Sequence, residues 1–522
     1  MSGHDSELIS ALRADLRSAT FTVSALTGLW GPDAEAALHR NQRVPALRAL
    51  AALAERLHAV PASATLARLF VLGLPVTPEA LAVALPSLGV EGAVALGLVA
   101  SADGSIVPLA DLRPYSFIDQ LGVGSWWVRS DLGELSLGHA VSEDHVLGVG
   151  GASLTLSGLM IQEPVDSVLD LGTGCGIQAM HAARHANRVV ATDISARALA
   201  IARFNAELND IHTIEFRLGS LFDPVAGERF DQILSNPPFV ITPRTEGVPS
   251  YEYRDGGMVG DALVESVIRG AGEHLTPGGI AQLLGNWEYS QGRDGLDRVT
   301  AWLAEDETRY LDAWIIERDT QRITEYAETW IRDGGTTPST PEFDRLYGAW
   351  LDDFEARGVS QVGFGYVTLR RPAADVQPNA SATALRRLER LPEALGTNGS
   401  GLGTHIAACL AGYDWASSRT DHELAAETVV VAPDVTVERH YWPGDDDPTA
   451  MSLRQGSGFG RSVPVGTGLA ALVGASDGDL SIGAICGALA QLLDVDAVEL
   501  QAELVIDVRG LIADGFLIAA VA

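Results

Sequence analysis

Residues 236–239 read Asn-Pro-Pro-Phe and follow a short apolar run. Two successive prolines fix their own φ angles and restrict the residues before them, so this turn is rigid. The Asn236 side-chain oxygen, with the carbonyl of Pro237 or Pro238, can accept hydrogen bonds from both protons of a planar –NH2 group, and the Phe239 ring offers a face for stacking. Because the lone pair of an amide or aryl amine is delocalised, such a nitrogen reacts only when it is oriented for in-line displacement. The turn therefore predicts chemistry on a planar nitrogen, without a metal.

A second signal lies in residues 168–177, Val-Leu-Asp-Leu-Gly-Thr-Gly-Cys-Gly-Ile. An apolar strand leads directly into three alternating glycines, Gly172, Gly174 and Gly176, and then into a helix. Glycine at such a turn lets the backbone approach a ligand that lies across the strand ends. A dinucleotide site would require the pattern G-x-G-x-x-G, whose last position is occupied here by Ile177.

Asp193 ends the next apolar run, 21 residues after Gly172. A carboxylate at the tip of a second strand can accept hydrogen bonds from both hydroxyls of a ribose. The structural alternative is that Asp193 is the N-cap of the following helix.

The G-x-G-x-G form, with Asp170 two residues before its first glycine, is similar to the S-adenosylmethionine site of class I methyltransferases. Family members often have an Asp that binds the adenine amino group where this chain has Ser220, although the backbone of the next residue can still contact the ring. The resemblance implies S-adenosyl-L-methionine as the cofactor, held by Asp170, Gly172, Thr173, Gly174, Gly176, Asp193, Ile194, Ser220, Leu221 and Asn236.

The Asn-Pro-Pro-(Phe/Tyr) motif resembles that of methyltransferases acting on planar nitrogens. They include the HemK-type glutamine N5-methyltransferases of release factors and the N6-adenine and N2-guanine enzymes of rRNA and DNA. The stretches 236–243, 253–257 (Tyr-Arg-Asp-Gly-Gly) and 275–279 (Leu-Thr-Pro-Gly-Gly) look most like the HemK type. The resemblance covers residues 150–285 closely and 286–372 loosely. It assigns the catalytic roles to Asn236, Pro237, Pro238 and Phe239.

Three functions remain open at this point. The first is methylation of a protein glutamine amide, for instance in a translation factor, which the HemK-like stretches and the acidity favour. The second is methylation of a base in rRNA, tRNA or DNA, which two winged-helix-like modules favour. The third is a non-catalytic regulator that binds S-adenosylmethionine.

Composition narrows the classes of protein. The chain has 522 residues, and 68 acidic against 36 basic residues give a net charge of −32. Every basic residue is Arg, so a P-loop Lys and a Schiff-base Lys are excluded. Such a negative net charge argues against a protein that binds nucleic acid mainly through its phosphate backbone. Three scattered cysteines, no basic N-terminal region before an apolar run and no uninterrupted membrane span predict a cytoplasmic protein.

The order of elements predicts an α/β fold. Strands alternate with helices from residue 166 onward, which is typical of a parallel sheet. We expect a Rossmann-like, seven-stranded methyltransferase sheet with strands at 167–171, 188–192, 214–217, 231–234, 279–284, 310–317 and 361–369.

The segments on either side of this α/β region have a different predicted order of helices and strands. Residues 1–110 read as amphipathic helices followed by a hairpin around Asp103-Gly104, either a winged-helix module for substrate recognition or a helical cap on the next domain. The methyltransferase domain is expected at 111–375. Residues 373–402 read partly as linker, and 376–522 form a C-terminal domain with strands at 428–431 and 436–441 and a winged-helix-like end at 480–517.

Two further features have alternative readings. An insertion at about 320–357 carries aromatic residues on one helix face, which indicates core packing or a lid over a substrate groove. His181 and His185 lie four residues apart without the Glu of a zinc motif, so we expect them on the surface. Cys175 is expected to be a small packing residue, and Asp445–Asp447 a solvated turn rather than a metal site. The oligomeric state is not predicted.

Overall fold

The computed structural model describes residues 3–57, 60–137, 141–251, 254–305, 308–373 and 384–520. Contacts divide the chain into two compact units. The first comprises Met1–Phe117, Val123–Ser157 and Glu163–Arg390, and the second Ile118–Gly122, Gly158–Gln162 and Leu391–Ala522. Tyr253, which belongs to one of the HemK-like stretches, lies outside the described residues.

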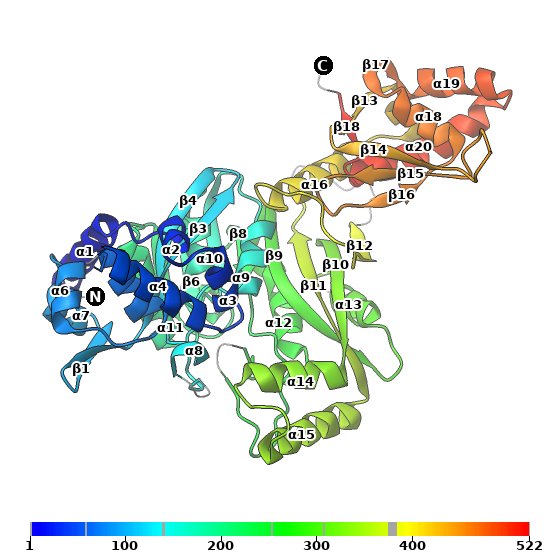
Figure 1. Cartoon of the computed structure of the whole chain (residues 1–522). Coiled ribbons are helices and arrows are strands. Elements are labelled where there is room, and N and C mark those ends of the chain that lie inside the picture. Colours follow the sequence, from blue (N-terminus) through cyan, green and yellow to red (C-terminus); the bar gives the residue numbers. More distant parts are fainter. Residues whose placement is uncertain are drawn as a thin grey trace. The chain divides into compact units, whose positions relative to one another are not determined.

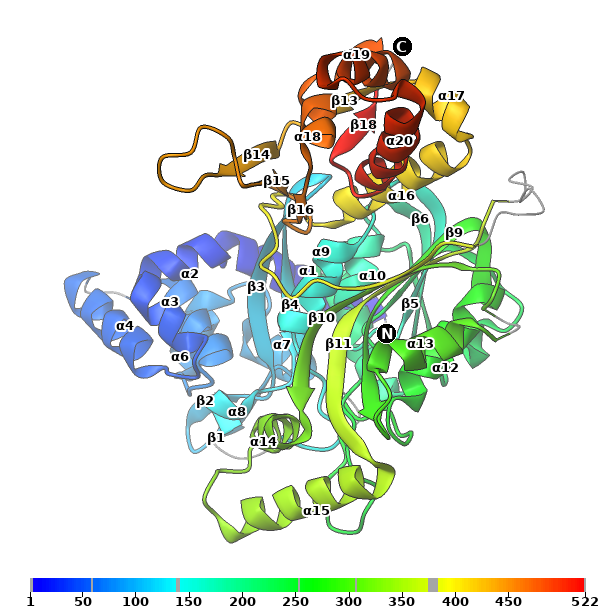
Figure 2. The same cartoon turned by 90° about the vertical axis from the view of Figure 1, so that its right-hand side faces the viewer.

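An eight-stranded sheet in the order β12-β10-β11-β9-β8-β5-β6-β7 forms the centre of the first unit (Figures 1 and 2). Strands β9, β8, β5, β6 and β7 are parallel, β11 is antiparallel to β9 and β10, and β12 is parallel to β10. The bounds in chain order are β5 Val165–Leu171, β6 Ala186–Asp193, β7 Ile214–Leu218, β8 Phe230–Ser235, β9 Leu275–Ser290, β10 Asp312–Arg322, β11 Val359–Arg370 and β12 Arg386–Arg390.

The α/β fold and its seven predicted strands are confirmed, but the sheet has an eighth strand in a segment expected to be partly linker. That segment, β12, reads Arg-Arg-Leu-Glu-Arg, which looks solvated because four of its five residues are charged. The charges are paired instead: Arg390 contacts Glu317 at 2.8 Å, and Arg387 contacts Glu389 at 3.0 Å. The expected boundary after residue 375 lies in 374–383, outside the described residues, and β12 extends the first unit to Arg390.

Helices cover both faces of the sheet because its central strands are apolar on both sides. Alternate strand residues such as Leu169 and Ile233 pack against α12 (Ala262–Ala271) and α13 (Gly295–Leu303). A separate hydrophobic cluster joins α10 (Ile177–Ala182) and α11 (Ala196–Leu208) to the hairpin β3–β4 (Asp111–Asp119 and Gly122–Ser130).

The N-terminal segment has the predicted helices and hairpin. Its elements are α1 Gly3–Ser18, α2 Val23–Trp30, α3 Pro32–Leu38, α4 Val44–Leu57, α5 Ala62–Leu66, η1 Ala67–Val71, α6 Pro78–Ala84, α7 Gly89–Ala95, β1 Val99–Ala102 and β2 Ser105–Pro108. Its apolar core includes Phe204 and Leu208 of α11. Arg13 of α1 also donates to the carbonyl of Leu208 at 2.9 Å, so this module packs against α11 of the eight-stranded sheet's unit.

α11 also fixes the β3–β4 hairpin. The side-chain oxygens of Asn205 and Asn209 accept hydrogen bonds from the backbone N–H groups of Arg129 and Trp127 at 2.8 and 2.9 Å. Two short helices, α8 (Glu134–Leu137) and α9 (Gly151–Leu159), lead from the hairpin to β5.

The insertion between β10 and β11 consists of α14 (Ile323–Asp333) and α15 (Pro341–Arg357). The predicted aromatic face of α15 is largely buried: Phe343, Trp350 and Phe354 are at most 7% exposed, and Tyr347 is partly buried against them. They form a hydrophobic cluster with Tyr326 of α14 and with Val240 and Ile241, which follow the Asn-Pro-Pro-Phe turn. The core-packing reading of the aromatic face is therefore confirmed.

The second unit has two three-stranded sheets, in the orders β17-β13-β18 and β14-β15-β16. The strands at 428–431 and 436–441 and the helix-helix-strand order at 480–517 are confirmed. Its elements are α16 Gly403–Ser417, α17 Asp421–Ala426, β13 Thr428–Val431, β14 Val435–His440, β15 Ala450–Gln455, β16 Ser462–Pro464, α18 Thr467–Gly474, β17 Asp477–Ser481, α19 Ile482–Leu493, α20 Ala497–Ala513 and β18 Leu517–Ala519.

Candidate active site

Two loops begin side by side at the carboxyl edge of the sheet. Leu171, the last residue of β5, pairs with Ser235, the last residue of β8, and the Ser235 hydroxyl donates to the Leu171 carbonyl at 2.8 Å. Gly172 follows the first strand, and Asn236 follows the second. The two motifs that the sequence singled out therefore start from neighbouring positions, where ligands bind in open α/β sheets.

The glycine loop has the backbone shape that its sequence requires. Gly172 and Gly174 have φ angles of 78° and 54°, in the left-handed region that favours glycine. No atom lies within 4 Å of a Cβ added at either residue, so a side chain there would fill open space above the loop. Gly176, with a φ angle of 89°, is also closely packed, since its added Cβ would lie 3.0 Å from the Cβ of Ala202 on α11.

Asp193, at the end of β6, holds the glycine loop in place. One carboxylate oxygen accepts from the N–H of Gly174 at 2.9 Å, and the other accepts from the N–H of Ser195 at 2.8 Å. The N-cap of α11 is Ser195, whose hydroxyl accepts from Ala198, so Asp193 is not the helix cap. These two hydrogen bonds fix the carboxylate at the carboxyl end of β6, beside the glycine loop.

Asp170 lies beneath the same loop and is 1% exposed. Its Oδ2 atom accepts from the Thr173 hydroxyl at 2.6 Å and from the N–H of Ala179 at 2.9 Å. Its Oδ1 atom is buried without a hydrogen-bond partner among the described residues. Burial raises the pKa of the Asp170 carboxyl to about 7, because desolvation penalises the charged form more than these hydrogen bonds favour it.

The third predicted cofactor contact lies after β7. Ser220 is exposed, and Leu221 has a φ angle of 46°, which is uncommon for a residue other than glycine. Ile194, next to Asp193, is 68% exposed, an apolar side chain left in solvent beside a carboxylate. These residues offer apolar surface and backbone groups at the strand tips, in keeping with binding of a flat ring.

Asn236, the first residue of the second loop, has a side-chain oxygen that lacks a hydrogen bond from the described residues. Its Oδ1 atom is buried, and nothing in residues 3–57, 60–137, 141–251, 254–305, 308–373 and 384–520 hydrogen-bonds to it. A buried acceptor without a partner costs free energy that a ligand donor would recover. The Phe239 ring is half-buried and lies edge to face with Trp330 and Phe364, with centroids 6.3 and 6.4 Å apart.

Contacts from distant parts of the chain hold the segment after Phe239. The Asn286 side chain of β9 donates to the Phe239 carbonyl, and the Tyr326 hydroxyl of α14 accepts from the N–H of Ile241 at 2.9 Å. Neither residue belongs to a motif that predicts a functional role from the sequence. Asn286 carries a weak signal, a polar side chain within an apolar strand, whereas Tyr326 is one of several aromatic residues in the insertion and has no distinguishing pattern.

Asp255 closes this segment into a compact loop. It forms an isolated β-bridge with Phe239, and its carboxylate accepts from the Thr242 hydroxyl at 2.5 Å and from the N–H of Tyr251 at 2.7 Å. A Cβ on the following Gly256 would lie 2.9 Å from the Pro238 carbonyl, so only glycine fits there without a shift. The Asp255-Gly256 pair, part of a HemK-like stretch, therefore fixes the conformation of the loop that follows Asn236.

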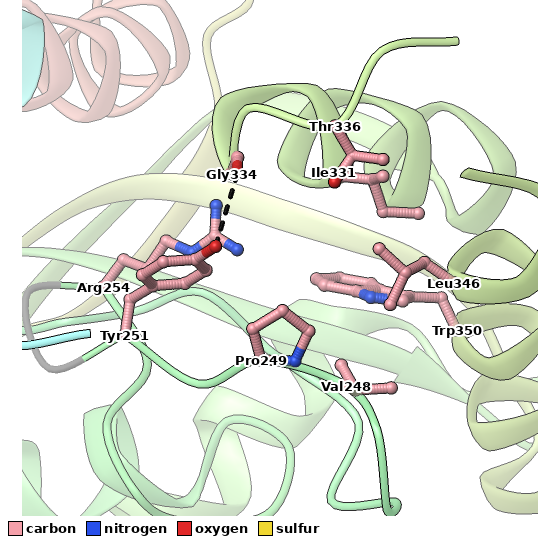
Figure 3. Close-up of a pocket in the computed structure, with 9 residues that line it drawn as sticks. All are labelled: Val248, Pro249, Tyr251, Arg254, Ile331, Gly334, Thr336, Leu346 and Trp350. Carbon is pink, nitrogen blue, oxygen red and sulfur yellow. Dashed lines mark hydrogen bonds between the residues drawn. The ribbon is translucent and has the colours of Figure 1, made fainter. Parts of the chain in front are cut away.

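A pocket lies between this loop and the insertion (Figure 3). The Arg254 guanidinium stacks over the Tyr251 ring at 4.4 Å, and the Tyr251 hydroxyl donates to the Gly334 carbonyl at 3.3 Å. Arg254 also pairs with Asp333 of α14 at 2.9 Å. The pocket is lined by Val248, Pro249, Tyr251, Arg254, Ile331, Gly334, Thr336, Leu346 and Trp350.

Two expectations for side chains near the glycine loop had different outcomes. The surface position expected for His181 and His185 is wrong, because they are 2% and 8% exposed. His181 packs among rings of the β3–β4 hairpin, such as Trp126, at 4.8 Å, and His185 contacts Gln232 at 2.8 Å. Cys175 is buried as expected, and burial raises the pKa of its thiol to about 11.

Among the residues that the structure describes, no group of three or more His, Cys, Asp or Glu side chains could hold a metal ion. No helix in the same residues is long and apolar enough to cross a bilayer.

Comparison with known proteins assigns the central segment to a class. Residues 149–293 match the family described as Methyltransferase small domain, and residues 18–109 match a domain of unknown function, DUF7059. The matched segment and the sheet around it make residues 149–293 a methyltransferase domain with a Rossmann-like fold, and S-adenosylmethionine is its cofactor. The open space above Gly172 and Gly174, the Asp193 carboxylate and the unpartnered oxygens of Asp170 and Asn236 fit that cofactor and a nitrogen acceptor.

The similar curated proteins methylate glutamine, according to their names. The chain is 34% identical over 209 residues to the ribosomal protein uL3 glutamine methyltransferase of Bradyrhizobium diazoefficiens, covering 37% of this chain and 60% of that protein. It is 40% identical over 130 residues to the release factor glutamine methyltransferase of Xylella fastidiosa, a match that covers 23% of this chain and 47% of that protein. The chain thus spans about half the length of these relatives.

A solved structure resembles the chain more distantly. The ribosomal protein L11 methylase of Lactobacillus delbrueckii subsp. bulgaricus is 21% identical, with a TM-score of 0.24, and the match covers 43% of this chain and 81% of that one.

Proposed function

We propose that the protein is a cytoplasmic N-methyltransferase that transfers a methyl group from S-adenosylmethionine to a glutamine side-chain amide of a protein, for instance a translation factor. The observation that carries the proposal is the pairing of Leu171 with Ser235, which starts the glycine loop and the Asn-Pro-Pro-Phe loop from adjacent positions. The similarity to named glutamine methyltransferases supports the protein amide as the acceptor.

In this proposal one loop binds the cofactor and the other binds the amide. Gly172, Gly174 and Asp193 hold the cofactor, whose sulfonium supplies an activated methyl group. The unpartnered Oδ1 atom of Asn236 and the carbonyl of Pro237 or Pro238 accept the two amide protons, and Phe239 stacks on the amide plane. These contacts would hold the amide nitrogen in line with that methyl group, which would replace one amide proton; the proton would pass to solvent water, and the cofactor would be left as its neutral thioether. Orientation and fixed dipoles supply the rate, without a charged base.

The test is methyl transfer with the full chain. Purified protein is incubated with labelled S-adenosylmethionine and fractionated extract, and the products are treated with protease or nuclease before the label is counted. Release by protease, with N5-methylglutamine found by mass spectrometry, supports the proposal. Release by nuclease would establish the base-methylating alternative instead. A non-catalytic regulator would transfer no label at all.

Asn236→Ala is the decisive variant, and Asn187→Ala is its matched control. Asn187 is an exposed asparagine at the opposite end of β6, where it donates to Asp166. Loss of transfer in the first variant with full transfer in the second would place the chemistry at the Asn-Pro-Pro-Phe loop. Equal activity in both would refute the assignment.

A further inference from the structure

Helix α20 of the second unit has one apolar face that no described residue of the chain covers. Its buried face packs into the core of that unit through residues such as Leu504 and Val508. The opposite side carries Val498, Ala502 and Ile506 at intervals of four residues, which lie in one row along a helix. Val498 is 78% exposed and Ile506 66% exposed. Two branched apolar side chains at such exposure, with an alanine between them in the same row, indicate a contact surface rather than scattered surface residues.

An acidic row runs directly beside the apolar one. Glu499, Glu503 and Asp507 each follow one residue after an apolar member and are all exposed. Like charges four residues apart destabilise a helix. None of the three carboxylates has an ion-pair partner in the described part of the chain, so nothing there relieves this repulsion. The α20 face is defined here as these three carboxylates and the three apolar residues.

The surrounding sequence contains no compensating charge. Residues 462–508 include seven acidic residues and no basic residue. The single Arg of α20, Arg509, is turned toward α17, where it contacts Asp421 at 2.7 Å and donates to the Arg419 carbonyl at 3.1 Å. The α20 face is therefore a hydrophobic strip with a uniform negative border.

This charge excludes the ligand that the order of elements would suggest. The chain runs α18, β17, α19, α20, β18, the order in which α20 follows α19 as the second helix of a helix-turn-helix pair (Figure 1). In nucleic-acid binders that helix enters the groove and meets phosphates. Three carboxylates there would repel the phosphate backbone. A second copy of the chain packed antiparallel on the same face would bring the two acidic rows together, which is also unfavourable.

We propose that the α20 face docks a cationic amphipathic segment of a protein partner. Apolar side chains of that segment would cover Val498, Ala502 and Ile506, and its Arg or Lys side chains would pair with the acidic row. Charge complementarity selects this occupant, and helix-in-groove recognition by apolar anchors with a charged border is a recurrent mode of binding. The inference does not depend on the methyl acceptor, since it concerns a different unit of the chain.

The test uses a synthetic 20-residue amphipathic helix of Leu and Arg, labelled with fluorescein, and fluorescence anisotropy with the full chain. The charge variant is Glu499→Arg/Glu503→Arg/Asp507→Arg. Its matched control, Asp445→Arg/Asp446→Arg/Asp447→Arg, changes three exposed acids of the same unit by the same total charge. The apolar variant is Val498→Ser/Ile506→Ser, which changes no charge. Circular dichroism verifies that each variant is folded.

The expected result separates specific docking from general attraction to an acidic protein. The charge variant should weaken peptide binding at least tenfold, and the apolar variant severalfold, whereas the control should bind as the unchanged chain does. Equal loss in the charge variant and its control would overturn the proposal. So would binding of a duplex DNA probe that the apolar variant weakens, or self-association by sedimentation that the apolar variant abolishes.

Discussion

The two loops of the proposed active site are held in different ways. The glycine loop is supported by its own neighbourhood: Asp170 lies on the strand before it, and Asp193 ends the next strand. The Asn-Pro-Pro-Phe loop depends on residues far along the chain, since its contacts with Asn286 and Tyr326 span 47 and 85 positions. The glycine loop, proposed to bind the methyl donor, is thus held by residues near it in the sequence. The shape of the Asn-Pro-Pro-Phe loop, proposed to bind the methyl acceptor, is set by β9 and the insertion. These two loops are called the donor half and the acceptor half of the site. We expect substitutions to separate the two halves.

The largest effect should come from Asn236→Ala on the acceptor side. Loss of one preorganised group that binds the reacting atoms lowers kcat by about 10²–10³-fold in comparable sites. We expect a decrease of at least this size in transfer assays with labelled cofactor. A variant that retains full kcat would show that the orphaned oxygen of Asn236 is structural.

Asp193→Ala should affect the donor side next most strongly. Hydrogen bonds to a charged group contribute about 1.5–3 kcal/mol, so cofactor affinity should fall about 10- to 100-fold. Calorimetry of cofactor binding measures this, and circular dichroism shows whether the protein stays folded. Unchanged affinity would contradict the role of Asp193 in binding the cofactor.

Tyr326→Phe should break the support of the acceptor loop while sparing the donor loop. It leaves the N–H of Ile241 without its acceptor in a buried position, which costs about 1–3 kcal/mol in the free energy of unfolding. Denaturant unfolding measures this loss, and KM for the acceptor should rise while the cofactor Kd stays constant. A rise in the cofactor Kd of similar size would mean that the two halves are coupled.

The smallest expected effect is a pH dependence on the donor side. Because the pKa of Asp170 is about 7, its carboxyl is mostly neutral at pH 6 and mostly ionised at pH 8. The ionised form favours a cationic cofactor, so affinity should rise with pH by at most about tenfold over this range. Calorimetry at both pH values tests this, and Asp170→Asn should remove the rise. An equal rise in that variant would assign the effect to another group.

The same contrast explains what the sequence could predict. The strands, the glycine loop and Asp193 follow from patterns within about 25 residues, and all of them are found in the expected elements. Asn286 and Tyr326 could not be assigned roles, because their partners lie next to them only after the sheet has formed. His181 was misplaced for a related reason: the rings that enclose it come from the β3–β4 hairpin, more than 50 residues earlier. Strand β12 was missed because its paired charges look solvated in the sequence.

The large sheet ends on each side in a strand of only five residues, β12 at one margin and β7 at the other. Both carry salt-bridged arginines, such as Arg387 with Glu389 and Arg217 with Glu228. Short edge strands with charged side chains pair poorly with a strand of another molecule. The architecture therefore guards an eight-stranded core against growth into aggregates, and replacing these arginines with apolar residues would open that route.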